Sequence, residues 1–274
     1  MRLLPIAALA IVLPVALATH AAASEPELVK IETQRVVYRE AGEFLLDSAP
    51  VNGPIAEVGV SRAFAIMRRQ VTRGEYDRCV AAGQCAPAEG PTAPDLPVVG
   101  VNFNDAVAYA KWLSRETGEA YRLPTDREWA IAAGSRYVDD GYGVVDDPRN
   151  PATRWLSRYE ANTKKSRTAD PEPRPAGAFG ENEHGLLDLS GNVWEWTSTC
   201  FERHATDSAT GKTERHAICG VRIAEGAHRA YLSSFIRDPR GGACSVGVPP
   251  ENLGIRLVRD DPDMLGRMRN FFGL

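Results

Sequence analysis

The stretch that decides the fold is DLSGNVWEWTSTC, Asp188 to Cys200. In it, Trp194 and Trp196 flank Glu195, after a Gly-Asn pair and before a run of small polar residues. Alternate residues of a strand share one face, so we expect both indoles in the core. The carboxylates of Asp188 and Glu195 have two interpretations, either a turn cap and a solvated strand edge or ligands of a bound cation. The flanking sequence has to separate these interpretations.

Three segments before this stretch predict helices that begin at a polar cap. Thr72 and Glu75 in VTRGEYDRCVAAG have the spacing of a capping box, in which each side chain bonds an otherwise unpaired backbone N–H. Thr125 and Glu128 in YRLPTDREW repeat that spacing. Between them, Asn104 is the expected cap of an amphipathic helix in NFNDAVAYAKWLSRETG. The shared device indicates one compact, locally consistent domain.

The rest of the chain carries weaker patterns. Residues 25–65 alternate loosely between apolar and polar, which predicts strands and turns. From Arg136 to Gly185 the periodicity fades into Gly, Pro, Asp and Asn, and so long a structureless stretch is unusual inside a compact domain. We therefore expect something to order it, and a bound cation is one physical option.

Residues 1–23 have the pattern of a secretory signal peptide. One arginine precedes an apolar run from Leu3 to Ala18, and small residues follow up to Ala23. A membrane anchor is the alternative, but two prolines and a run shorter than ~20 residues disfavour it. We expect a periplasmic or secreted protein with no membrane span after cleavage.

Charge and cysteine content narrow the possible partners. The formal net charge is −4 and no basic block occurs, which argues against nucleic acid as a partner.

In an oxidising compartment the five cysteines are expected to form disulfides. Cys79 and Cys85 lie close enough to pair at a helix end. Cys200, Cys219 and Cys244 are an odd set: either Cys200 pairs with Cys219, or one of these two pairs with Cys244, and the sequence leaves the choice open.

Six segments carry a resemblance to a known family: EYDRCV, PVVGVNFNDAVAYAKWL, YRLPTDREW, NEHGLLDLSGNVWEWTS, RGGA and NLGIRLVR. In this order they resemble the signature blocks of the formylglycine-generating enzymes, or sulfatase-modifying factors. The resemblance implies an irregular α/β (α+β) fold, C-type-lectin-like, with little regular secondary structure. The expected organisation is a signal peptide at 1–23, an N-terminal strand segment at 24–54, the family domain at 55–260 with an insertion at about 200–232, and a tail at 261–274.

The resemblance also implies structural calcium beside the GNVWEW block. Calcium takes six to eight oxygen ligands and accepts mixed sets of carboxylates and carbonyls. A second family site would use Asn162 and Thr163, with Asp170 as a further candidate. Carried over to this chain, the first site would consist of the side chains of Asp188 and Glu195 and the backbone carbonyls of Gly191 and Val193.

The chain departs from the family at the expected active site. Family enzymes oxidise a substrate cysteine to formylglycine with molecular oxygen, and two cysteines after an RGGS-type turn hold copper(I), for which soft thiolates are the expected ligands. Here the segment is RGGACSVGVPPENLGIRLV, so Ala243 replaces the serine and Cys244 is the one thiol that follows. We therefore expect no two-thiolate copper site and neither copper nor iron. Cys244 remains the candidate catalytic residue.

Two further groups of polar side chains are candidates for binding. Arg237 and Arg240 precede the turn, where their forked donors suit a carboxylate or a peptide carbonyl. A surface salt-bridge cluster is the alternative. His204, His216 and His228 lie in the insertion without the tight spacing of metal ligands, so we expect them to be solvated.

Three functions remain open at this point. The favoured one is an exported maturation or accessory factor for a periplasmic client protein, similar to nitrite-reductase-associated factors and without cysteine-to-formylglycine oxidation. The first alternative is a metal-dependent oxidase, an oxidoreductase for a protein or small molecule, with a site rebuilt around Cys244. The second is a non-catalytic module that binds a protein or ligand, since a fold by itself does not specify a function.

Overall fold

The computed structural model describes residues 25–141, 156, 172–239 and 252–260. The expected signal peptide, the tail at 261–274 and five of the candidate site residues lie outside the described residues; these five are Asn162, Thr163, Asp170, Arg240 and Cys244. Within the described part, no helix is both long and apolar enough to cross a bilayer.

The first sheet joins the two ends of the described chain. Its strand order is β1-β6-β12-β7. Antiparallel pairing places β12 between β6 and β7, so a C-terminal strand is inserted among N-terminal ones. The bounds are β1 Leu28–Ile31, β6 Phe64–Met67, β7 Tyr121–Arg122 and β12 Val258–Asp260.

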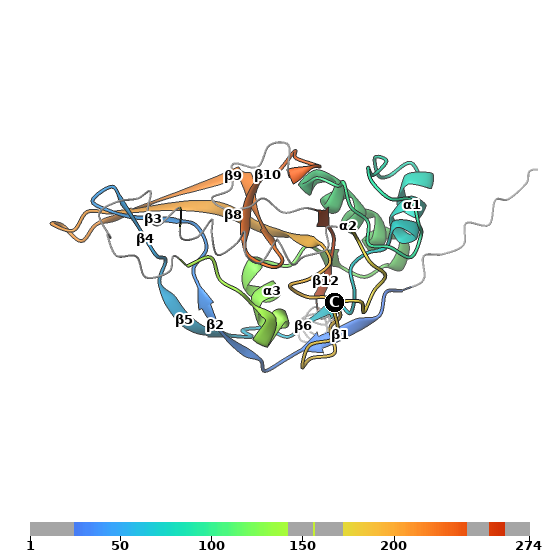
Figure 1. Ribbon diagram of the computed structural model, residues 1–274, viewed down its shortest axis with the longest axis horizontal. Coiled ribbons are helices and arrows are strands. Elements are labelled where there is room, and N and C mark those ends of the chain that lie inside the picture. The colour runs from blue at the N-terminus through green and yellow to red at the C-terminus, as the bar shows by residue number, and fades with distance from the viewer. Residues whose placement is uncertain (1–24, 142–155, 157–171, 240–251, 261–274) are drawn as a thin grey trace, which may run out of the picture.

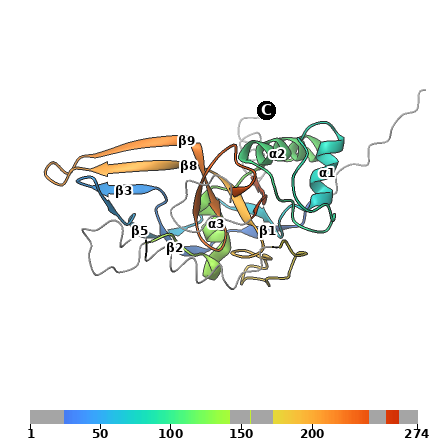
Figure 2. The same ribbon diagram turned by 45° about the horizontal axis from the view of Figure 1, so that its top comes forward.

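The second sheet is built on a long hairpin of β8 and β9. It has the order β10-β9-β8-β3-β4, and β11 also pairs with β8, in parallel. The hairpin reaches away from α1 and α2 toward the opposite end of the molecule, with β3 beside it (Figures 1 and 2). The bounds are β3 Glu43–Leu46, β4 Ala49–Val51, β8 Trp194–Thr206, β9 Thr213–Glu225, β10 Ala230–Ser233 and β11 Leu253–Gly254.

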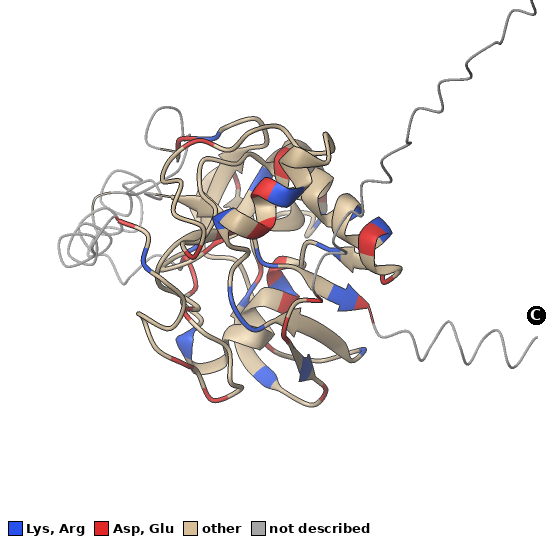
Figure 3. Cartoon of the chain, turned by 90° about the vertical axis from the view of Figure 1, so that its right-hand side faces the viewer, with Lys and Arg blue, Asp and Glu red and all other residues tan. Residues whose placement is uncertain are grey.

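A two-stranded sheet of β2 (Arg35–Arg39) and β5 (Ile55–Gly59) completes the strands. Residues 24–54, expected to lead into the domain, contribute a strand to each of the three sheets. Basic and acidic residues are interspersed over the visible elements (Figure 3).

The helices α1, α2 and α3 each begin with a capping box. Helix α1 (Arg73–Ala81) begins after Thr72, and α3 (Asp126–Ala133) begins after Thr125, as predicted. Helix α2 (Phe103–Thr117) is capped by Asn102, so the prediction of Asn104 was wrong. The reason is chemical, because Asp105 stands three residues after Asn102. The Asp105 carboxylate accepts a hydrogen bond from the backbone N–H of Asn102, and the Asn102 side chain accepts one from the backbone N–H of Asp105.

The core confirms the expectation for the two indoles. Trp196 is fully buried and Trp194 is 8% exposed. Helix α2 and strand β8 pack into one apolar cluster, and Trp129 of α3 belongs to a second, which lies against β1 and β6. The result is the expected mixed α/β fold with few helices.

Candidate functional site

The loop before β8 has an unusual backbone. Three non-glycine residues in it adopt positive φ: Asp188 (61°), Ser190 (59°) and Asn192 (61°). Such residues are uncommon and persist where surrounding contacts hold them. The two carboxylate oxygens of Asp188 accept hydrogen bonds from the backbone N–H groups of Gly177 (2.7 Å) and Phe179 (2.8 Å). Asp188 therefore connects Gly177 and Phe179, which lie near the end of the segment 136–185 without periodicity, to the loop before β8.

Glu195 lies at the centre of a buried hydrogen-bond network. Its side chain accepts bonds from Gln70 Nε2 (2.7 Å), Trp129 Nε1 (2.6 Å) and, with both oxygens, Arg256 Nε (3.0 and 2.9 Å). Arg256 is fully buried and also donates to the carbonyls of Met67 and Leu187. Glu195 therefore lies neither at a solvated strand edge nor with its carboxylate oxygens free of hydrogen bonds. Its charge is balanced by a guanidinium inside the fold.

These contacts bear on the calcium expectation. Asp188 oxygens each accept one hydrogen bond and keep lone pairs, and the turned loop is rich in backbone oxygens, which suits calcium. Glu195 instead has its oxygens occupied by three donor side chains. Of the two carboxylates, Asp188 therefore has the greater remaining capacity to bind a cation, and the calcium site with the carbonyls of Gly191 and Val193 stays a prediction. Among the described residues, no three His, Cys, Asp or Glu side chains are grouped to hold a metal ion.

A cavity of about 240 Å³ adjoins the family's active-site segment. Its lining includes Pro239 and Asn252, the described residues on either side of that segment. Arg237 also lines it, but its guanidinium bonds Asp105 (3.0 Å) and the carbonyl of Pro87 (2.8 Å). Arg237 is therefore engaged in an internal ion pair at the cavity wall. Whether it also binds a substrate remains a prediction.

A second cavity, of about 310 Å³, lies against the hairpin sheet. Phe44 and Phe201 form part of its apolar wall, and Asp140 and Tyr231 contribute polar groups. The ring of Phe44 also stacks on His204 at 4.3 Å.

The expectation that all three histidines are solvated was wrong for two of them. His204 is 9% exposed and His228 is 5% exposed, whereas His216 is exposed. His204 is buried because it stacks on Phe44. His228 is buried because its ring packs edge-on against Trp194, whose indole N–H donates to the His228 carbonyl.

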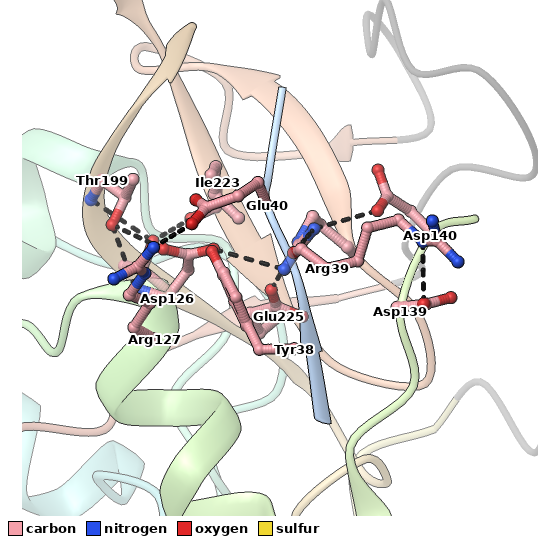
Figure 4. Close-up of polar contacts among 12 residues, drawn as sticks. Tyr38, Arg39, Glu40, Asp126, Arg127, Asp139, Asp140, Thr199, Ile223 and Glu225 are labelled. Atoms are coloured by element: carbon pink, nitrogen blue, oxygen red, sulfur yellow. Dashed lines mark hydrogen bonds and ion pairs between the residues drawn. The ribbon is translucent and has the colours of Figure 1, made fainter. Parts of the chain in front are cut away.

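The sequence did not predict a buried charged cluster, which includes Asp140 from the wall of the 310 Å³ cavity. Figure 4 shows Tyr38, Asp126, Asp140 and Glu225 of this cluster. Arg229 is 1% exposed and donates to three carboxylates, Glu225 (2.8 Å), Asp140 (2.9 Å) and Asp126 (3.3 Å). Tyr38 donates its hydroxyl to Asp126. The four partners come from four separate segments, and only the i, i+4 spacing of Glu225 and Arg229 is visible in sequence.

Burial also acts on the carboxylates themselves. Burial raises the pKa of Glu225 to about 8, and the nearby charge of Asp126 adds to the rise, while Arg229 opposes it. The Glu225 Oε2 atom has no hydrogen-bond partner among the described residues. Burial also raises the pKa of the Tyr38 hydroxyl. The cluster therefore holds Glu225 in its neutral form near pH 7.

Four cysteines form two disulfides, and the second pair decides between the two pairings that the sequence left open. Cys79 bonds Cys85 at the end of α1, and Cys200 bonds Cys219 across the hairpin of β8 and β9. The expected insertion at about 200–232 is therefore largely this cross-linked hairpin together with β10. Cys244 is the cysteine left over, and it lies outside the described residues.

The chain was compared with known proteins. A solved structure, PvdO from Pseudomonas aeruginosa, matches with a TM-score of 0.53 at 23% identity over 86% of this chain and 95% of that one, which shows the fold. The formylglycine-generating enzyme of Streptomyces coelicolor is 31% identical over 175 residues, which cover 61% of this chain and 54% of the relative. The inactive C-alpha-formylglycine-generating enzyme 2 of Mus musculus is 36% identical over 169 residues, which cover 60% and 49%.

The chain spans about half the length of the curated relatives it matches. The model of the sulfatase-modifying factor enzyme 1-like domain matches residues 20–261. That match includes all three sheets and the candidate sites. Because it covers most of the sequence, the chain belongs to the sulfatase-modifying factor enzyme 1-like domain family.

Proposed function

We propose that this chain is an exported accessory factor that binds a client polypeptide and does not oxidise cysteine to formylglycine. The observation that carries the proposal is the state of the thiols. Four of the five cysteines are in disulfides, which leaves Cys244 alone. A copper(I) site of the kind the resemblance implies needs two thiolates. One chain in this disulfide state cannot supply them.

Two further observations support the proposal. Relatives from Mus musculus and Bos taurus that match at 36% and 35% identity are named inactive, so loss of the reaction has parallels among similar proteins. Two disulfides are typical of proteins in oxidising compartments, which agrees with export. The cavity between Pro239 and Asn252, with Arg237 in its wall, is the place we assign to the client.

The proposal is tested with the purified full chain, copper(I), oxygen and a cysteine peptide from a sulfatase, with formylglycine detected by mass spectrometry. The Streptomyces coelicolor enzyme is the positive control. We expect no aldehyde product, and one reactive thiol per chain in a denatured, unreduced sample. Aldehyde formation, or three free thiols per chain, would contradict the loss of oxidase activity.

Client binding needs a separate measurement. The chain is immobilised and exposed to periplasmic extract, and a retained polypeptide is identified and its mass determined. Arg237→Glu is expected to weaken retention, whereas Arg35→Glu, on the distant strand β2, is a matched charge change that leaves it intact. Equal retention by both variants would contradict the assignment of the client to this cavity, and a mass change on the client would mark chemistry instead of binding alone.

A further inference from the structure

The two disulfides differ in the exposure of one sulfur. Cys79 is fully buried among the apolar residues of the larger core cluster, and its partner Cys85 is half-buried. Cys219 is exposed and Cys200 is half-buried. An attacking thiol has to reach one sulfur of a disulfide, and the other sulfur leaves as a thiolate. Access and solvation therefore favour attack at Cys219 over attack on the bond of Cys79.

The chain around Cys219 is open to an incoming partner. The pairing of β8 and β9 shifts at this point, because Cys200 pairs with Arg222 while the next residue of β8 pairs with Ile218. A Cβ atom built on Gly220 would meet nothing within 4 Å. Cys219 is itself exposed, on a stretch of β9 whose residues are exposed.

A cation contacts the other sulfur of the bond. Arg222 donates through Nη1 to Cys200 Sγ (3.1 Å) and to the carbonyl of Ser198 (2.6 Å). Its guanidinium lies over the ring of Phe103 at 4.3 Å, which fixes its position. The Arg222 Nε atom is buried and has no hydrogen-bond partner among the described residues. A thiolate formed at Cys200 would therefore lie beside the Arg222 guanidinium, whose Nε–H has no hydrogen-bond partner among the described residues.

We propose that the Cys200–Cys219 disulfide is a thiol–disulfide exchange site for an exported polypeptide that carries a pair of thiols. The client's thiolate attacks Cys219 Sγ, the S–S bond breaks, and its electron pair leaves on Cys200 Sγ beside Arg222. The client's second thiol then attacks the client sulfur of the mixed disulfide and releases Cys219. The client dithiol is oxidised to a disulfide, the Cys200–Cys219 bond is reduced to two thiols, and the two protons pass from the client to these cysteines.

Apolar side chains beside Cys219 suit a polypeptide more than a small thiol. Phe235 is 73% exposed and Ile218 is 44% exposed. The backbone of Ser234 joins these positions, because its N–H donates to the carbonyl of Gly220 (2.9 Å). Exposed apolar groups near Cys219 offer contacts that a polypeptide can use and a small thiol cannot. The proposal goes beyond the accessory role, and it rests on that role only for the expectation that the chain and its client are exported.

The test compares the two disulfides within one molecule. The oxidised full chain is exposed to reduced glutathione, quenched with an alkylating agent and mapped by mass spectrometry. We expect reduction of Cys200–Cys219 to be at least about tenfold faster than that of Cys79–Cys85, with glutathione trapped on Cys219. Equal rates, or glutathione trapped on Cys200, would overturn the proposal. Both readouts use the unmodified protein, so they do not depend on the folding of any variant.

Variants and a dithiol substrate complete the test. Arg222→Gln should slow reduction of Cys200–Cys219 by about three- to tenfold, since the leaving thiolate loses its cation, and should leave Cys79–Cys85 unchanged. Arg222→Lys should restore part of the rate, and Arg35→Gln is the surface control. A synthetic peptide with two cysteines should become a disulfide in the same amount as Cys200–Cys219 is reduced. An unchanged rate in Arg222→Gln, or a peptide left reduced, would contradict the mechanism.

Discussion

The buried carboxylate of Glu225 predicts that the protein loses stability as the pH rises. Its pKa is about 8 in the folded chain against an ordinary value of 4.5, because burial disfavours the charged form. Between these two values the unfolded chain has released the proton and the folded chain retains it. The free energy of unfolding therefore falls with rising pH across this window. The contribution is fully present below about pH 4.5 and is lost by about pH 8.

The size of the effect follows from the gap between the two pKa values. Each unit corresponds to about 1.4 kcal/mol, so the full gap sets an upper bound of about 5 kcal/mol. Other charges in the cluster rearrange as Glu225 ionises, and we expect a loss on the order of 3 kcal/mol between pH 5 and pH 8. Glu225→Gln keeps an acceptor for Arg229 and has no proton to release. The variant should therefore lack this part of the pH dependence.

The assay is urea unfolding of the wild type and Glu225→Gln at several values between pH 5 and pH 8.5. The difference between their unfolding free energies should shift in favour of the variant by several kcal/mol as the pH rises. Glu57→Gln, an exposed change on β5, should give a profile parallel to that of the wild type. Parallel profiles for Glu225→Gln and the wild type would show that Glu225 is ionised in the folded protein, and would refute the reasoning from its burial.

Two further predictions concern the loop and strand around the GNVWEW block. Arg256→Met should lower the free energy of unfolding by about 3–5 kcal/mol because it leaves Glu195 as an unpaired buried charge, and adding Glu195→Gln should recover part of that loss. Additive effects of the two changes in urea unfolding would contradict the pairing. Calcium held by Asp188 should make the midpoint of thermal unfolding fall on addition of EDTA, since an ion bound only by the folded state stabilises it. This shift should be absent in Asp188→Ala, and an unchanged midpoint in calcium-loaded wild type would contradict the assignment.

Local features could be predicted from the sequence because they depend on neighbours along the chain. A capping box needs only an acceptor and a returning side chain three residues later, so Thr72 and Thr125 were found correctly. The same rule, applied strictly, selects Asn102 over Asn104, since only Asn102 is followed at that spacing by an acidic residue. The pair Cys79 and Cys85 is equally local.

The candidate sites depended on contacts between distant residues. Trp194 and Trp196 could be placed in the core by alternation, but the role of Glu195 depends on Arg256, which is 61 positions away and reaches it through the parallel pairing of β11 with β8. Sequence spacing says nothing about such a partner. A buried carboxylate and a solvated one look the same in a sequence.

By itself, then, the sequence determined the family, the starts of α1 and α3, the core indoles and the lack of a second thiol after the RGGA turn. The tertiary structure decided how the charges are used. It enclosed Arg229 among three carboxylates, set Arg256 against Glu195 and placed Arg222 on the sulfur of Cys200. The physical reason is that helix caps are short-range hydrogen bonds, whereas the energy of a charge depends on its removal from water and on the groups that replace the water.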